Sequence, residues 1–107
     1  MDLPAGVLAL RAARLERLSD WMAHALEDLV TGGELRRTEG GTWVGPAGVG
    51  GRHYAPLTIR GLKRRGFIRY TEQRISPYGR KFWGRCEPTA AALARLERLR
   101  ASRQGAR

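Results

Sequence analysis

The chain has 107 residues, of which 42% are hydrophobic, so it is long enough for one core and too short for two independent ones. Its formal net charge of +10 predicts a polyanionic partner. No segment has the run of roughly 20 apolar residues that a membrane span needs, no export signal is recognisable, and the single cysteine, Cys86, excludes an internal disulfide, so we expect a cytoplasmic protein.

The first predicted element is helical and extends from Pro4 to Thr31. Its apolar residues recur at spacings of seven, three and four, the pattern of one helix face: Leu8, Leu15, Leu18, Met22, Ala25 and Leu29. Ser19 and Asp20 form a plausible N-cap, so the segment is either one long helix or an N-terminal helix over residues 1–18, which could serve as a dimerisation arm, followed by a second helix from about 20 to 31. The stripe either covers the core of its own domain or packs against a second chain, and we expect a homodimer.

A β-hairpin is predicted after Gly32-Gly33, which ends the helix. Its strands are Leu35–Arg37 and Thr42–Val44, joined by a turn at Glu39-Gly40-Gly41. The glycine-rich segment Gly45–Gly51 then predicts a surface loop.

The next predicted element is a short amphipathic helix that begins at Ala55-Pro56 and ends at Gly66. A helical projection places Ile59 and Leu62 on the face toward the core. The opposite face carries Leu57, Arg60, Gly61 and Arg64, with Lys63 and Arg65 at its flanks. An outward Gly61 has no side chain, so we expect this face to approach a partner closely.

A second β-hairpin is predicted next, with strands over residues 67–75 and 81–86. Its turn is Ser76-Pro77-Tyr78-Gly79, and its cations are Arg69, Arg74, Arg80, Lys81 and Arg85. Glu87-Pro88-Thr89 begins a last helix with leucines on one side, and residues 102–107 form a basic flexible tail. The prediction is an α+β fold in which helices pack on short β-hairpins in the order α-β-β-α-β-β-α, with one domain over residues 19–101.

The positive charge is concentrated in the second helix and the second hairpin. Residues 52–85 hold ten Lys and Arg against one acid, whereas residues 1–51 hold five against seven and residues 86–107 hold five against two. On the helix alone, such charges are typical of a solvated outer face. In an isolated protein, however, the cations of the helix and of the hairpin would repel one another, because so few acidic residues lie among them. We therefore expect an anionic partner.

The segment Tyr54–Ile68 (YAPLTIRGLKRRGFI), with the hairpin and Glu87–Leu93 after it, resembles the recognition helix, wing and following helix of winged helix-turn-helix DNA-binding proteins. MarR-like transcriptional regulators and small phage and bacterial winged-helix proteins belong to this class. Its pattern T-x-x-x-L-x-x-[KR]-G-[LF]-[ILV] is matched by Thr58, Leu62, Arg65, Gly66, Phe67 and Ile68. The resemblance implies a transcriptional regulator at the nucleoid that binds double-stranded DNA sequence-specifically.

By this resemblance, residues 56–65 lie in the major groove and the wing, residues 67–86, lies on the backbone or minor groove. The residues expected to contact DNA are Leu57, Thr58, Arg60, Gly61, Lys63, Arg64, Arg65, Arg69, Arg74, Tyr78, Arg80 and Lys81. A full helix-turn-helix has a short helix just before the recognition helix, where this chain has a hairpin and the GPAGVGG loop. There are two alternatives: the same surface binds structured RNA, or it binds an acidic protein.

No motif for catalysis or metal binding is recognisable: the sequence lacks G-x-S-x-G, H-E-x-x-H and G-x-x-x-x-G-K-[ST]. His24, His53 and Cys86 do not have the spacing of metal ligands. We therefore expect a protein that is not an enzyme and that needs no cofactor and no metal. The three tryptophans, Trp21, Trp43 and Trp83, are expected to be core or half-buried packing residues, with stacking of Trp83 and Phe82 on a base as the alternative.

Overall fold

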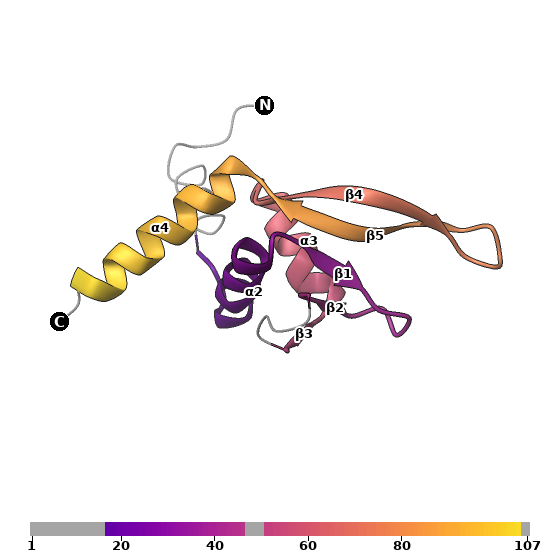
Figure 1. Ribbon diagram of the computed structural model, residues 1–107, viewed down its shortest axis with the longest axis horizontal. Helices are drawn as coiled ribbons and strands as arrows, with labels where there is room; N and C mark the ends of the chain where they lie inside the picture. Colours follow the sequence, from indigo (N-terminus) through magenta and orange to yellow (C-terminus); the bar gives the residue numbers. More distant parts are fainter. Residues whose placement is uncertain (1–16, 47–50, 106–107) are drawn as a thin grey trace, which may run out of the picture.

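The computed structural model describes residues 17–46 and 51–105 (Figure 1). This part of the chain contains three α-helices and one five-stranded antiparallel sheet, so the predicted α+β class is confirmed. Its elements are α2 (Asp20–Gly32), β1 (Leu35–Arg37), β2 (Trp43–Val44), β3 (His53–Tyr54), α3 (Pro56–Arg64), β4 (Ile68–Ile75), β5 (Lys81–Pro88) and α4 (Ala90–Gly105). The two helix leucines Leu8 and Leu15 lie outside the described residues. None of the described helices combines the length and apolar character needed to cross a membrane.

Helix α2 begins where the sequence predicts an N-cap. The Ser19 hydroxyl accepts a hydrogen bond from the Met22 amide at 3.1 Å, which satisfies one of the free amides at the start of the helix. The helix ends at Gly33, whose φ of 79° is left-handed and therefore suits glycine. Residues 17–19 are not helical, so the prediction of one continuous helix is wrong; the N-terminal helix predicted over residues 1–18 lies outside the described residues up to residue 16.

The sheet has the strand order β3-β2-β1-β5-β4. The two predicted hairpins are present. Strand β3, which pairs with β2 through Trp43 and Tyr54, was not predicted. The order of the described elements is therefore α-β-β-β-α-β-β-α. A two-residue strand such as His53–Tyr54 is too short to show an alternating pattern, so it could be found only from its pairing.

The core lies where α2 and α3 pack against each other and against the sheet. Helix α2 contacts β1 and β5, and α3 contacts β4. The largest fully buried side chains are Tyr54, Leu26, Leu29, Leu35, Ile59, Leu62, Ile68 and Cys86. From this body α4 and the β4–β5 hairpin extend in opposite directions (Figure 1). Helix α4 continues through Gly105, into the segment predicted as a basic tail.

A buried polar pair connects α2 to the strand just before α3. The Tyr54 hydroxyl donates a hydrogen bond to the Asp28 carboxylate, and Tyr54 is fully buried. Burial, followed by the hydrogen bond to Asp28, raises the pKa of Tyr54 above its ordinary value. Because α3 starts two residues after Tyr54, this pair fixes the start of α3 relative to α2.

Two tryptophans differ in burial from one another. Trp43 is buried, as predicted, whereas Trp21 is 58% exposed. The Trp21 ring meets the rings of His24 and Tyr54 edge-on, with centroids 6.4 Å and 6.2 Å apart. Trp21 is therefore more exposed than the core or half-buried position expected for it, and Trp83, at 42%, is exposed as well.

Candidate nucleic-acid interface

Helix α3 exposes a cationic face. Ile59 and Leu62 are buried, as their spacing predicts, while Leu57 is 71% exposed. The cations of the outer face, Arg60, Lys63 and Arg64, are exposed as well. The helix stops because Gly66 follows with a φ of 77°, a left-handed conformation that favours glycine.

Gly61 does not belong to this outer face, and its expected place there is wrong. It is buried against α2, where a Cβ at Gly61 would overlap Met22 Cε and lie 3.4 Å from Met22 Sδ. On a helix, Gly61 lies about 100° from Leu62. Gly61 is therefore buried only if the neighbouring elements cover a wider part of the helix surface than the part that carries Ile59 and Leu62. The neighbour that widens this covered part is α2, which the sequence does not place.

Arg65 and Thr58 also point away from the outer face. Arg65 is half-buried, and its guanidinium donates to the Arg17 carbonyl at 3.1 Å and to the Gly61 carbonyl at 2.9 Å. Thr58 lines a small hollow beside Trp21 on the α2 side of the helix. Arg65 therefore connects α3 to the segment before α2, and both side chains are half-buried.

The outer side of the sheet carries a network of ion pairs. Arg69 bonds Glu87 at 3.2 Å, Arg74 bonds Glu72 at 2.7 Å and Arg36 bonds Glu34 at 2.8 Å. Arg85 lies 3.9 Å from Glu34 and 4.0 Å from Glu72. The hydrogen bond from Arg74 lowers the pKa of Glu72.

These pairs correct the expectation that the hairpin's cations have almost no counter-charges. Glu34 and Glu87 lie outside residues 52–85, so a count along the sequence leaves them out. The strand register brings them in: β1 pairs with β5, and Arg69 lies opposite Glu87. The predicted contacts of Arg69 and Arg74 with DNA compete with these pairs.

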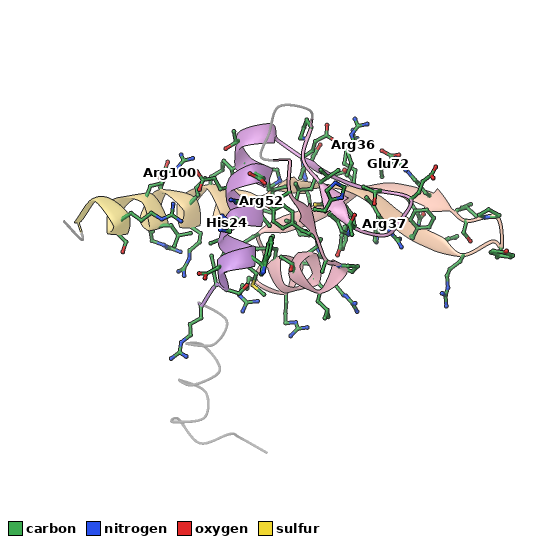
Figure 2. All side chains as sticks on the ribbon, turned by 90° about the horizontal axis from the view of Figure 1, so that it is seen from below. His24, Arg36, Arg37, Arg52, Glu72 and Arg100 are labelled. Atoms are coloured by element: carbon green, nitrogen blue, oxygen red, sulfur yellow. The ribbon has the colours of Figure 1, made fainter. Side chains whose placement is uncertain are left out.

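Other cations have no such partners: Arg60 and Arg64 lie on α3, Lys81 lines a cleft beside α3, and Arg80 lies at the hairpin tip in a hollow that it shares with Arg74. Within residues 17–46 and 51–105, no carboxylate lies within 4.0 Å of Arg60, Arg64, Arg80 or Lys81. Two further cations lie over aromatic rings: Arg37 is 4.6 Å from the Phe82 centroid, and Lys63 Nζ is 5.8 Å from the Tyr70 centroid. Figure 2 shows Arg36 near Glu72 on one side of the sheet and Arg37 on the side of α3.

A cleft of about 500 Å³ lies between α3 and the sheet. Its aromatic floor comes from three strands: Trp43, Tyr70 and Trp83. The Tyr70 and Trp83 rings are stacked, with centroids 5.6 Å apart and an interplanar angle of 8°. Its cations are Arg37, Arg60 and Lys81. Arg37, Trp43 and Tyr70 were not predicted as site residues, because only the register of the strands brings them beside α3.

The tip of the β4–β5 hairpin is fully exposed. Tyr78 is 97% exposed, and its backbone amide and that of Arg80 donate to the Ser76 hydroxyl at 3.3 Å and 3.1 Å. An aromatic ring without packing partners at a basic tip is available for contact with a ligand.

Among the described residues, no group of His, Cys, Asp and Glu could hold a metal ion. Comparisons with protein-family models, with curated proteins and with solved structures gave no match.

Proposed function

We propose that this protein binds double-stranded DNA sequence-specifically, as a transcriptional regulator of the winged-helix type. In this proposal α3 enters the major groove, and the β4–β5 hairpin lies along the backbone or the minor groove. The observation that carries the proposal is the difference between the cations that have carboxylate partners and those that have none. Glutamates pair with the arginines of the outer side, whereas the cations of α3 and the hairpin tip have no carboxylate partner among the described residues.

The arrangement of the elements supports the same proposal. A helix with an exposed cationic face, a long antiparallel hairpin and a further helix follow one another as α3, β4–β5 and α4. The departure lies before α3, where β2 and β3 stand in place of a short helix. Helix α3 is supported from behind by α2, whose Met22 packs against Gly61, so its cationic face is held outward without that short helix.

A binding titration at several salt concentrations tests the proposal. Labelled duplex DNA should bind with an affinity that falls with salt, with a log-log slope of about −4 or steeper, because several phosphates are contacted. The same titration with duplex RNA separates the alternative partner. Tighter binding of RNA, or no measurable binding of DNA at about 50 mM salt, would overturn the proposal.

Two charge-matched double variants locate the surface. Arg60→Ala with Arg64→Ala removes two cations without carboxylate partners from α3, and Arg69→Ala with Arg74→Ala removes two ion-paired cations from β4. The first variant should weaken the binding of duplex DNA, because α3 loses two cationic contacts with it. The second should change the affinity little. Equal effects of the two variants would contradict the assignment of the surface.

A homodimer belongs to the same proposal. Leu93 on α4 is 48% exposed, although Leu96 on the same helix is buried, so the leucines of α4 are not all used within the described domain. Two copies of α3 about 34 Å apart would read two half-sites of a palindrome. Sedimentation equilibrium gives the mass in solution, and a monomer at the concentrations that bind DNA would contradict the dimer.

A further inference from the structure

We propose that the cleft between α3 and the β4–β5 hairpin receives one unpaired nucleotide of the bound strand, with its base against Trp83 and its phosphate between Arg60 and Lys81. The inference rests on the proposed binding of DNA and adds a preference for duplexes that contain an unpaired base. It assigns a separate role to the cleft, beside that of the outer face of α3.

The aromatic floor supports a planar base as the occupant. Trp83 remains 42% exposed although one of its neighbours, Tyr70, is stacked on it in parallel. Trp43 continues the row, with its centroid 6.1 Å from that of Tyr70. A base that joins this row extends an existing stack, and stacking tolerates every base because each has a π-face. The volume of about 500 Å³ lies within the range of about 300–1,000 Å³ that is typical of small-ligand sites.

The charges beside the floor support an anionic group attached to that base. Arg60 comes from α3 and Lys81 from β5, so the two cations approach the cleft from different elements. Neither has a carboxylate partner among the residues that the structure describes, and no acidic side chain lines the cleft. Rings that stack and cations that are unpaired together match a nucleotide, which combines a flat base with a phosphate.

The base must be unpaired because both of its faces are already stacked in an intact duplex. Extruding a paired base costs a few kcal/mol, and the cost is smallest for a base that has no partner. A duplex with one unpaired nucleotide avoids most of this cost. We therefore expect the protein to bind such a duplex about tenfold more tightly than a fully paired one, equivalent to about 1.4 kcal/mol.

The test compares two labelled duplexes of the same length, one fully paired and one with a single bulged adenine, by fluorescence anisotropy. Trp83→Ala should remove the preference for the bulged duplex and leave the affinity for the paired duplex unchanged. Trp83→Phe, which keeps a ring on Tyr70, should restore most of the preference. Tyr78→Ala is the matched control, since it removes an exposed aromatic ring of the same hairpin outside the cleft.

The outcomes separate the inference from the function on which it rests. Equal affinity of the unmodified protein for both duplexes overturns the inference and leaves DNA binding intact, and it needs no variant to fold. Equal loss of preference in Trp83→Ala and Tyr78→Ala also overturns it. Free deoxyadenosine monophosphate that binds tightly without changing the affinity for either duplex would identify a small-molecule site instead. No binding of either duplex overturns the inference together with the proposed function.

Discussion

Met22 of α2 packs against the backbone of α3 at Gly61, where a side chain at Gly61 would overlap its terminal methyl group. This contact sets how closely the two helices approach. It also fixes which sector of α3 is covered, so that Arg60 and Arg64 point outward. A residue that the sequence analysis assigned to the partner's side therefore controls the orientation of the cationic face from within.

Replacing Gly61 by alanine tests this contact. In an open helix position the substitution would stabilise the fold by about 0.5–1 kcal/mol. Here the new methyl group must displace Met22, and overpacking typically costs about 1–3 kcal/mol. We expect Gly61→Ala alone to leave the free energy of unfolding unchanged or lower, and to raise it by about 0.5–1 kcal/mol in a Met22→Ala background. Urea unfolding of the four proteins of this double-mutant cycle measures both values. A stabilising Gly61→Ala in the unmodified background would contradict the contact.

Local sequence patterns predicted the parts of the structure that depend on local chemistry. The N-cap at Ser19, the buried pair Ile59 and Leu62, and the stop at Gly66 each follow from a few adjacent residues, and each is present. The order of the elements was right except for β3, which has only two residues.

The features that sequence analysis missed depend on contacts between distant segments. Gly61 is buried because α2 lies against it, and nothing within α3 indicates that neighbour. Glu34 and Glu87 neutralise arginines of other segments, which only the register of β1, β4 and β5 explains. The charge distribution along the sequence therefore indicated a cationic surface but could not tell its paired cations from its unpaired ones.

Reading of bases by α3 predicts a difference between helix and hairpin variants. If Arg60 and Arg64 each make a bidentate contact with guanine on a fully paired duplex, which places no nucleotide in the cleft, their replacement by alanine should reduce discrimination between sequences by about 1–3 kcal/mol each. Arg80→Ala and Lys81→Ala should instead weaken binding to all sequences similarly, because contacts with phosphate carry no sequence information.

Selection from random duplexes, followed by titration of the selected site and a scrambled one, gives the discrimination of each variant. Losses that are the same for the selected and scrambled duplexes in all four variants would rule out base reading by α3. In that case the helix would act as a backbone contact only.

Tyr54→Phe tests the buried pair that fixes the start of α3. The substitution leaves the buried Asp28 carboxylate without its hydrogen-bond donor, which should lower the free energy of unfolding by about 1–3 kcal/mol. Because burial and the bond to Asp28 raise the pKa of Tyr54, its contribution is complete below about pH 10 and is lost as the pH rises further.

Tyr70→Phe is the matched control, since the Tyr70 hydroxyl has no hydrogen bond within the described part of the chain. Urea unfolding at pH 7 and at pH 10.5 measures both variants. Equal stability of Tyr54→Phe and Tyr70→Phe at pH 7 would show that the bond to Asp28 contributes nothing.

The buried thiol of Cys86 gives the last prediction. Cys86 is fully buried between β1 and β4 in the sheet, and burial raises its pKa to about 12. Since the thiolate is the reactive form, the folded protein should not react with a disulfide reagent such as dithionitrobenzoate at pH 8, and reaction should follow unfolding in urea.

The raised pKa also means that the Cys86 thiol stabilises the fold fully below its unfolded pKa of about 8.5 and progressively less as the pH rises toward 12. Rapid labelling of one thiol per chain without urea would contradict the burial, and Cys86→Ala supplies the blank for the assay.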